Sequence, residues 1–355
     1  MPKISMLACL ALSCAQAADE VKLNEVTVTS ATGFEQNIKD APASVSVISQ
    51  KEIARRNHQD IESVVKDAPG VFGATLGAAS RRGITMRGLG QKYTKILIDG
   101  RPATSDSAYR GLRAVGSAQN FLPPANTIER IEIVRGPMSS LYGSDAMGGV
   151  INIITKGFSN EFSGNVNGYY TLAGKSGIND DYQTGFYANG AVIPDVLGIA
   201  LYGRYFHKFE DERAFTNRKN EDVNFGAKIM YNATENDEIA LDLRRVVNKY
   251  ERTEGKTLNR TASDNTSVAF EKMSGYTASL SHTGKYDKLL LESFLMHDNM
   301  KESGQQDLTL KTTTLNTKGT YFFDNNTLSL GAEYRRERLN EKATTADAAN
   351  VKRYD

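Results

Sequence analysis

The sequence predicts a mixed α+β domain followed by the antiparallel strands of a transmembrane β-barrel. From Phe158 onward, apolar and polar residues alternate in long runs that contain many aromatic residues and glycines and hardly any proline. The connections between these runs alternate between short turns and longer polar loops, which is typical of transmembrane barrels. No apolar run of about 18 residues or more is present, so the sequence offers no transmembrane helix.

The first residues follow the order of regions in a secretory signal peptide. Lys3 supplies a positive charge, Met6 to Leu12 form a short apolar segment, and Ala15 to Ala17 form a small-residue cleavage site. We therefore expect residues 1–17 to be a signal peptide that is removed, so that the mature chain begins at Ala18.

Both cysteines, Cys9 and Cys14, lie inside this segment. The mature chain then has no disulfide and no thiol, so its stability must come from a core or from a membrane. A lipoprotein signal acylated at either cysteine is an alternative, although neither has a convincing leucine three residues before it. The formal net charge of +1 over 355 residues gives no indication of a nucleic-acid partner.

Residues 18–34 are predicted to be a polar lead that contains one short strand. Glu25 to Thr29 alternate polar and apolar side chains, and no partner strand is obvious nearby. An unpaired strand on a flexible tether can add to the edge of a partner's sheet through main-chain hydrogen bonds. The alternative is a disordered N-terminus.

Residues 35–156 are predicted to form one mixed α/β domain. Ser49 and Glu52 fit a capping box for a helix through about Arg56. Asp60 can cap a second short helix that ends at Pro69-Gly70. Two polar loops interrupt the domain, and the second is long enough to suggest a function. The loops lie at about 75–83 and about 101–121, and strands are expected at Val45–Ile48, Ile84–Gly88, Lys95–Gly100, Ile128–Arg135 and Gly148–Ile154.

Residues 157–355 are predicted to be the N-terminal part of a β-barrel. In Val223–Tyr231 one face is apolar and the other polar, as in a strand between lipid and a wet lumen. Such runs reach about 10 residues, against about 5–6 for strands in soluble sheets, which argues against a soluble β-sandwich. About nine strands can be counted, whereas complete single-chain bacterial barrels have an even number. Short turns are expected at 193–195, 234–237, 284–287 and 324–326, and longer loops near 174–181, 211–221, 252–268 and 301–308.

The segment Ile131–Lys156 (IEIVRGPMSSLYGSDAMGGVINIITK) resembles the plug signature of TonB-dependent outer-membrane receptors. Residues 84–101 and 34–49 resemble two further plug motifs of that family. The resemblance is strongest over residues 25–156 and is greatest to the colicin I receptor and the ferric catecholate siderophore receptors. It implies a plug domain inside a barrel of about 22 strands, of which this chain holds about nine.

The resemblance also implies a function, namely energy-coupled uptake of a ferric siderophore of catecholate type through a multi-pass barrel in the outer membrane. TonB would be the direct partner on the periplasmic side, where the N-terminus lies, and ExbB and ExbD indirect ones. Outer-membrane lipid would surround the barrel, and colicins or phage are further docking candidates. Iron would arrive as a chelate, so no cofactor, no metal site and no enzyme activity are expected. The lead strand would then be the TonB box, formed by Glu25, Val26, Thr27, Val28 and Thr29.

Two sets of plug residues are singled out by the same resemblance. Arg87 and Arg135 each precede a glycine at a strand end, and they are expected to meet glutamates of the barrel wall that lie C-terminal to Asp355. The two plug loops are expected to face outward and to bind an anionic, aromatic ligand by ion pairing and stacking. The ordinary alternative for each arginine is a solvated surface charge. The expected ligand contacts are Arg81, Arg82, Arg101, Tyr109, Arg110 and Arg113.

Three other interpretations stay open from the sequence alone. In the first, the ligand is another large molecule such as haem or cobalamin, although neither plug loop carries the histidine expected of a haem receptor. In the second, the chain is the non-transporting product of a truncated receptor gene, with barrel edges left unpaired. In the third, the chain is a secreted soluble β-rich binding protein.

Overall fold

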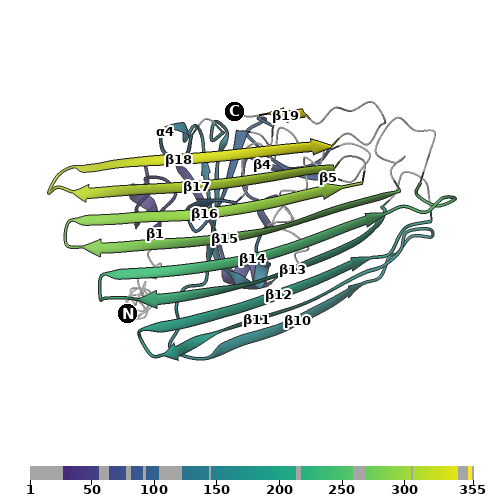
Figure 1. Cartoon of the computed structure of the whole chain (residues 1–355), viewed down its shortest axis with the longest axis horizontal. Helices are drawn as coiled ribbons and strands as arrows, with labels where there is room; N and C mark the ends of the chain where they lie inside the picture. The colour runs from purple at the N-terminus through teal and green to yellow at the C-terminus, as the bar shows by residue number, and fades with distance from the viewer. Residues whose placement is uncertain are drawn as a thin grey trace, which may run out of the picture.

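The computed structural model contains two β-rich regions, an inner domain and a wall of long strands (Figure 1). The structure describes residues 27–355 apart from several gaps. The gaps are residues 56–63, 77–80, 91–92, 104–121, 144, 213–216, 259–268, 305–306, 343–350 and 354–355. The predicted signal peptide, Asp60 and most of the second plug loop therefore lie outside the described residues. No helix within the described ranges is both long enough and apolar enough to cross a membrane.

The inner domain is built on a five-stranded sheet in the order β3-β8-β9-β6-β7. All neighbours are antiparallel except β6 and β9, which are parallel. A separate hairpin, β4–β5, and a two-stranded pair, β1–β2, lie beside it. The sheet strands are β3 (Ser44–Ser49), β6 (Thr94–Ile98), β7 (Arg101–Pro102), β8 (Ile128–Arg135) and β9 (Gly149–Thr155). The other elements are β1 (Thr27–Val28), β2 (Gln36–Asn37), η1 (Ile38–Asp40), α1 (Gln50–Ala54), β4 (Val71–Leu76), β5 (Arg81–Met86), η4 (Ala125–Thr127) and α4 (Ser139–Tyr142).

The sheet is held by an apolar core of β-branched side chains on its central strands. Ile131 and Ile133 on β8 lie opposite Ile153 and Ile151 on β9, and all four are fully buried. Burying a side chain of this size stabilises the fold by about 1.5–3 kcal/mol. The predicted strands at 45–48, 128–135 and 148–154 are confirmed by β3, β8 and β9.

The helix after β3 begins with the predicted capping box. The Glu52 backbone N–H donates to Ser49 Oγ at 3.4 Å, and the Ser49 backbone N–H donates to Glu52 Oε2 at 2.8 Å. These bonds satisfy donors that a helix N-terminus otherwise leaves open. The helix ends at Ala54, slightly earlier than the predicted end at about Arg56.

Gly149 occupies a position that no other residue type fits. Its φ of +147° is unfavourable for residues with a side chain, and an added Cβ would lie 2.3 Å from the Val134 carbonyl oxygen. This close approach lets β8 and β9 pair at the start of β9.

The prediction of a loop over 75–83 is wrong at both ends. Strand β4 continues to Leu76, and β5 begins at Arg81 and pairs with it. The alternating Gly/Ala/Ser composition concealed this hairpin, because small residues have weak strand propensity.

The wall consists of nine long antiparallel strands in sequence order, with the short β19 (Val351–Arg353) paired to the last of them. The sheet is open within the described chain, because its order begins at β10 and does not return to it. The long strands are β10 (Ser163–Thr171), β11 (Asp181–Ile193), β12 (Leu197–Lys208), β13 (Lys219–Asn232), β14 (Asp237–Glu251), β15 (Phe270–Tyr286), β16 (Leu289–Ser303), β17 (Asp307–Phe322) and β18 (Thr327–Lys342). This agrees with the predicted count of about nine strands and with an incomplete barrel.

The short turns all lie at one end of the wall (Figure 1). Turns at 194–196, 233–236 and 323–326 match the predictions. The turn predicted at 284–287 is tighter, because β15 runs on to Tyr286 and β16 starts at Leu289. The longer loop predicted at 301–308 is also wrong. Strand β16 extends to Ser303 and β17 starts at Asp307, because strand pairing continues through polar residues.

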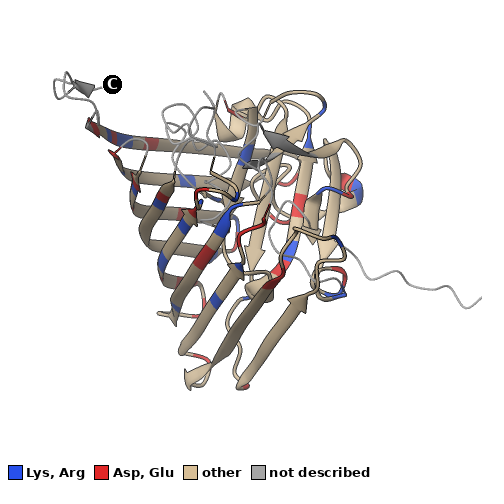
Figure 2. Ribbon diagram, turned by 90° about the vertical axis from the view of Figure 1, so that its right-hand side faces the viewer, with Lys and Arg blue, Asp and Glu red and all other residues tan. Residues whose placement is uncertain are grey.

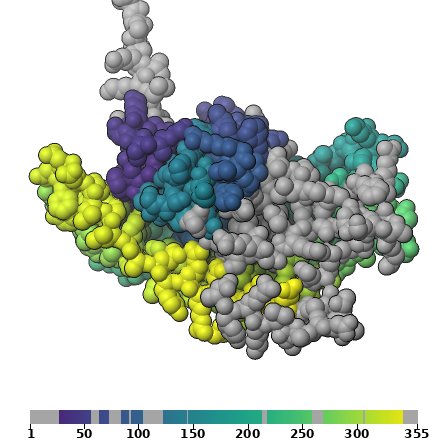
Figure 3. Space-filling view, turned by 90° about the horizontal axis from the view of Figure 1, so that it is seen from above, coloured from purple at the N-terminus to yellow at the C-terminus, as the bar shows by residue number. Residues whose placement is uncertain are grey.

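The wall curves around one side of the inner domain (Figures 2 and 3). Strand residues that face the inner domain are mostly polar and buried, such as Asp242, Arg244 and Asn248 on β14. Residues on the other face are mostly apolar and exposed, such as Leu280, Leu295 and Leu315. The wall is therefore apolar on its outside and polar on its inside, as predicted from its alternating sequence.

Candidate functional site: contacts of the N-terminal segment and the wall

The described part of the predicted TonB box is paired rather than free. Thr27 and Val28 form β1, which pairs antiparallel with Gln36 and Asn37 in β2, and Val28 is fully buried. The expectation that this strand has no partner nearby is therefore wrong. The chain turns back through residues 29–35, and the partner strand is too short to be visible as an alternating pattern. Glu25 and Val26 lie outside the described residues.

A buried carboxylate in the inner sheet holds the segment that follows β1. Glu132 on β8 is fully buried, and its Oε2 accepts hydrogen bonds from the backbone N–H groups of Thr29 and Ser30, both at 2.9 Å. Ser30 Oγ donates to the same oxygen at 2.6 Å. The Arg130 guanidinium lies 3.0 Å from Glu132 Oε1. Hydrogen bonds to a carboxylate are stronger than those between neutral groups. These contacts of Glu132 with Thr29 and Ser30, which we call the N-terminal clasp, therefore fix the direction of the N-terminal segment.

Tyr142 and Asn152 complete the clasp from two neighbouring elements. Tyr142 donates its hydroxyl to the Ser30 carbonyl at 3.0 Å. Burial, with the nearby charges of Glu132 and Glu292, raises the pKa of Tyr142, so this hydroxyl stays protonated as a donor. Asn152, which is only 2% exposed, donates to Ser30 Oγ at 3.0 Å.

The same segment also contacts the wall near its short turns. Lys318 on β17 donates to the Gly33 carbonyl at 2.6 Å and pairs with Glu292 on β16 at 2.6 Å. The ring of Phe34 meets Phe322 edge-on, with 5.3 Å between centroids. The N-terminal segment therefore lies between the inner sheet and the wall and contacts both.

A tight turn between β6 and β7 docks the inner domain on the wall. Asp99 and Gly100 have φ values of +49° and +76°, as in the hairpin turns that favour Asp-Gly. Asp99 accepts from the backbone N–H and the hydroxyl of Thr155, both at 2.8 Å. Lys228 on β13 donates to Asp99 at 3.1 Å and to the Thr155 hydroxyl at 2.9 Å. An ion pair thus joins the two regions.

Opposing effects set the ionisation of Asp99. Burial disfavours the charged form, but the positive charges of Lys228 and Arg101 and the bonds from Thr155 outweigh it. Together they hold the pKa of Asp99 at about 2, below its ordinary value of 3.8. Asp99 is therefore ionised at neutral pH and keeps its partners on both regions.

Asn152 connects this turn to the N-terminal clasp. Its amide nitrogen donates to Ser30 Oγ, and its amide oxygen accepts from the Gly100 backbone N–H at 3.1 Å. A short chain of hydrogen bonds therefore runs from Ser30 through Asn152 to the Asp99-Gly100 turn, and from there to Lys228 on the wall. A displacement of the N-terminal segment acts directly on the docking turn.

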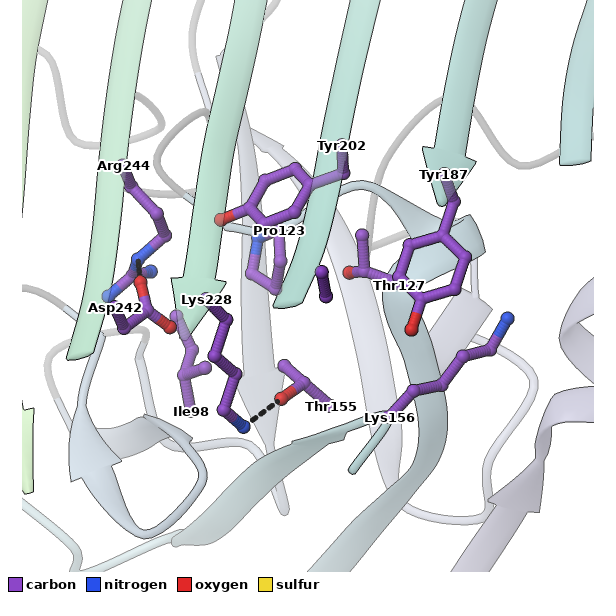
Figure 4. A pocket seen from close by; sticks show the side chains of 11 residues that line it. Ile98, Pro123, Thr127, Thr155, Lys156, Tyr187, Tyr202, Lys228, Asp242 and Arg244 are labelled. Carbon is purple, nitrogen blue, oxygen red and sulfur yellow. Dashed lines mark hydrogen bonds and ion pairs between the residues drawn. The ribbon is translucent and has the colours of Figure 1, made fainter. Parts of the chain in front are cut away.

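A small cavity lies beside the docking turn, between the inner sheet and the wall (Figure 4). Lys228 points across it toward Thr155, and Asp242 pairs with Arg244 on the same strand at 3.2 Å. The two surfaces are incompletely packed here, and both polar and apolar side chains line the gap between them. The lining residues are Ile98, Pro123, Thr127, Thr155 and Lys156 from the inner domain and Tyr187, Ala200, Tyr202, Lys228, Asp242 and Arg244 from the wall.

Arg101 lies at this interface, and its predicted position on an outward-facing ligand loop is wrong. It is 6% exposed, and it donates to Ser279 and Ser281 on β15 at 3.1 and 3.3 Å. It also pairs with Asp99 at 3.2 Å. The hairpin turn before it directs the side chain to the wall, which a sequence without a known register does not reveal.

The other predicted ligand residues are not placed by the structure. Arg81 and Arg82 belong to β5, but only their backbone is described. Tyr109, Arg110 and Arg113 lie outside the described residues. Their role as ligand contacts stays a prediction.

The two arginines of the predicted plug–barrel lock lie close together. Both side chains approach Gly70. Arg135 donates to Ser44 and Ser46 at 2.9 and 2.8 Å and to the Pro69 carbonyl at 3.1 Å, all within the inner domain. Arg87 is exposed, with a φ of +51°. Their pairing with wall glutamates beyond Asp355 stays a prediction.

Sequence reasoning missed Glu132, Asn152, Asp99 and Lys228. Glu132 and Asn152 interrupt otherwise apolar strands, and a polar residue at an apolar position indicates a specific buried partner. Asp99 was predicted only as part of the strand Lys95–Gly100, whereas β6 ends at Ile98 and Asp99 lies in the turn. These irregularities could have marked the residues, but not their partners.

Comparison with known proteins places the inner domain in a family. Residues 37–150 match the TonB-dependent receptor plug domain. The iron-regulated outer membrane virulence protein of Vibrio cholerae is 40% identical over 196 residues, which are 55% of this chain and 30% of that protein. The ferric enterobactin receptor of Pseudomonas aeruginosa is 33% identical over 57% of this chain and 28% of its own length. The vitamin B12 transporter BtuB of Photobacterium profundum is 34% identical over 57% of this chain and 30% of its own length.

Solved structures share the arrangement of both regions. The siderophore receptor PirA from Acinetobacter baumannii superposes with a TM-score of 0.73 at 25% identity, over 83% of this chain and 48% of that one. A ferric enterobactin receptor mutant from Pseudomonas aeruginosa, in complex with enterobactin, superposes with a TM-score of 0.73 at 23% identity, over 86% and 51%. The chain thus spans about half of the structures it matches, and the aligned part is about a third of the curated relatives.

Proposed function

Because this chain carries the plug domain of the TonB-dependent receptors, followed by strands of their barrel, we propose that it acts in energy-coupled uptake of a ferric siderophore across an outer membrane. The observation that carries the proposal is the N-terminal segment, which lies between plug and wall and contacts both. Relatives named as siderophore and ferric enterobactin receptors support the ligand class. We propose a catecholate siderophore as the ligand.

The proposed coupling begins at Glu25 to Thr29, the segment that TonB would bind on the periplasmic side. A strand can be captured by main-chain pairing with a partner's sheet edge. For Thr27 and Val28 this requires exchange of the present partner, β2, for the new one. TonB would therefore compete with an internal strand, and its pull would reach Glu132 through Thr29 and Ser30.

The proposed transmission follows the hydrogen-bond chain described above. A pull that draws Ser30 away from Glu132 also breaks its bond to Asn152, which holds Gly100. The docking turn then loses one of its supports beside the Asp99–Lys228 pair. Water can replace the polar bonds of the docking turn once they break, at a small net cost for each bond.

The proposed ligand surface comprises Arg81, Arg82, Tyr109, Arg110 and Arg113. A ferric tris-catecholate is anionic and has aromatic faces, which suits guanidinium groups that pair and stack. Arg101 is not included, because it is buried against the wall. Docking of a colicin at the same face is a second proposed use of the receptor.

The coupling proposal is tested by Val26→Pro in the receptor that contains this chain, in cells that lack other siderophore receptors. Proline removes a backbone donor and disfavours strand pairing, so we expect ferric enterobactin binding to be unchanged and its uptake to fall at least tenfold. Lys22→Pro, outside the proposed TonB box, is the matched control and should keep uptake. Equal uptake by both variants would refute the TonB contact.

The ligand class is tested separately by binding. Ferric enterobactin and cyanocobalamin are titrated against the purified receptor and against the Arg81, Arg82, Arg110 and Arg113 to Ala variant. We expect enterobactin to bind and the variant to weaken it at least tenfold. The relation to vitamin B12 transporters makes cobalamin the specific competitor, and binding of cobalamin alone would overturn the siderophore assignment.

A further inference from the structure

The outward face of the wall differs between its two halves. On β10 to β13, outward positions are mainly apolar along most of each strand, as at Val166, Phe186 and Phe225. On β14 to β18, cations occupy outward positions in the halves nearest the long loops. These residues, which we call the cationic band, are Arg245, Lys272, Lys301, Lys311, Arg336 and Arg338.

Strand alternation fixes the direction of these side chains. Arg245 is flanked by Arg244 and Val246, which are buried against the inner domain. Lys301 lies between Met300 and Glu302, which are likewise buried. Since neighbouring strand residues point to opposite faces, the band points away from the plug. It therefore lies outside any ligand path through the lumen.

Register brings the band together in one row across the strands. Arg245 lies opposite Tyr276, which lies opposite Asn299, and Asn299 lies opposite Lys311. Lys311 in turn lies opposite Arg338. With strands about 4.8 Å apart, this row is about 19 Å wide.

The other three cations lie close to this row along their strands. Lys272 and Lys301 lie four and two residues further toward the long loops than Tyr276 and Asn299. Arg336 lies two residues closer to the short turns than Arg338. Six cations thus occupy a zone about 20 Å long at about 3.4 Å per residue.

The band has no internal counter-charge within the described residues. No salt bridge to any of its six members is found there, whereas the neighbouring outward lysines Lys219 and Lys249 pair with Glu251 and Glu221. Within the zone that the six cations occupy and up to the long loops, Asp307 is the sole acidic residue at the described outward positions of β15 to β18. Like charges this close repel, so an external anion would relieve the band.

An apolar row crosses the same strands on the short-turn side of the band. Leu241, Leu280, Leu295, Leu315 and Tyr334 are linked by register across the same five strands. The last four are 49–63% exposed. This row is about 14 Å from Arg245, four residues along β14. Arg336, two residues from Tyr334 on β18, is close enough to lay its apolar stem along this row with its charge at the boundary of the hydrocarbon region.

We propose that the cationic band binds the phosphate groups of anionic lipid at the long-loop side of the membrane. The inference rests on the proposed function, because it requires the wall to face lipid. The six cations of the band supply the charge, and the apolar row holds the acyl chains. Membrane-proximal Lys or Arg contributes roughly 1 kcal/mol each to binding an anionic surface, which is about fivefold in affinity.

The test uses the receptor that contains this chain, with Lys301, Lys311 and Arg338 all changed to Gln. Native mass spectrometry measures phosphatidylglycerol bound to the detergent-solubilised protein during titration. Three lost cations should weaken binding about 100-fold. The matched control changes Lys219, Lys249 and Lys285 to Gln, which removes the same charge elsewhere, and it should bind as the parent does. Equal affinity in both triple variants would overturn the proposal.

Two further readouts separate the possible failures. Inorganic phosphate should not displace the lipid at millimolar concentration, because it lacks acyl chains for the apolar row. Displacement would mean a site for free anions and would overturn the lipid assignment. Both triple variants should keep enterobactin uptake, since the band lies outside the lumen. A receptor that does not insert into phosphatidylcholine vesicles at all would instead contradict the proposed function.

Discussion

The inner sheet and the wall use the same alternation of side chains in opposite ways. In β8 and β9 of the inner sheet, the isoleucines lie inside a core and Glu132 and Asn152 are isolated buried polar groups. In the wall, most leucines are outside and exposed, and polar residues make up most of the buried inner face beside an apolar cluster that includes Val246 and Met273. The inner sheet therefore buries its apolar residues in its own core, whereas the wall presents most of its apolar residues outward and most of its polar residues toward the inner domain.

This difference explains how the two regions can be joined and yet be separable. The contacts between them include the polar bonds of Asp99, Arg101 and Lys228 and those of the N-terminal segment. Polar bonds can be exchanged for bonds to water at a small net cost, whereas an apolar core cannot be opened without exposing its area. We expect the inner domain to shift as a body before its core opens.

Ile133→Ala is expected to give the largest effect, because Ile133 is fully buried in the core of the inner sheet. The lost transfer energy and the cavity should lower the free energy of unfolding by about 2–5 kcal/mol. Leu295→Ala on the outward face, where the side chain is 49% exposed, is the matched control. Urea unfolding in detergent measures both, and equal losses would contradict the difference between the two regions.

Asp99→Asn should have the next largest effect, because it leaves Lys228 and Arg101 without their shared carboxylate. We expect docking of the plug on the wall to weaken by about 3 kcal/mol, at the low end for a buried pair. Hydrogen exchange of the 96–103 segment measures this. Asp287→Asn, at the exposed turn between β15 and β16, makes the same chemical change away from the interface and is the control.

The Asp99 effect should also depend on pH in a defined direction. The pKa of Asp99 is about 2 in the folded protein and about 3.8 in the unfolded chain. The contribution of the ionised carboxylate to folded-state stability is therefore complete above about pH 4 and is lost as pH falls toward 2. The difference between the parent and Asp99→Asn should therefore disappear at the lowest pH. A difference that persists unchanged there would show that the charge is not its cause.

Asn152→Ala should have the smallest effect on stability. Its most specific effect should be on the connection between the N-terminal segment and the Asp99-Gly100 turn. It removes the bonds to Ser30 and Gly100 in a buried site, at a cost of about 1–3 kcal/mol. We expect faster exchange in both residues 29–33 and 98–101. Asn126→Ala, whose amide makes a longer, exposed bond to Asn165, is the control. Faster exchange in only one of the two segments would break the proposed connection.

Local features of the fold were predictable because short-range physics determines them. The Ser49 capping box depends on residues close in sequence, and β8 was visible from its own alternation. The number of wall strands followed from alternation alone. Errors occurred where strands run through polar or small residues, as in β4–β5 and between β16 and β17.

The candidate site was less predictable, because its contacts join residues far apart in the chain. Thr29 and Glu132 are 103 positions apart, and Arg101 and Ser279 are 178 apart. Glu132 was visible only as a charge in an apolar strand, and Arg101 as one cation among several. No local pattern states which distant side chain such a group meets.

The sequence by itself determined the two regions, the strand periodicity, the turns that need glycine and the family of the plug. Only the tertiary structure decided that β1 pairs with β2, that Glu132 clasps Ser30, and that Asp99 docks on Lys228. The physical reason is that alternation specifies whether a side chain is on the polar or the apolar face. The partner on that face depends on register and on how one sheet lies against the other.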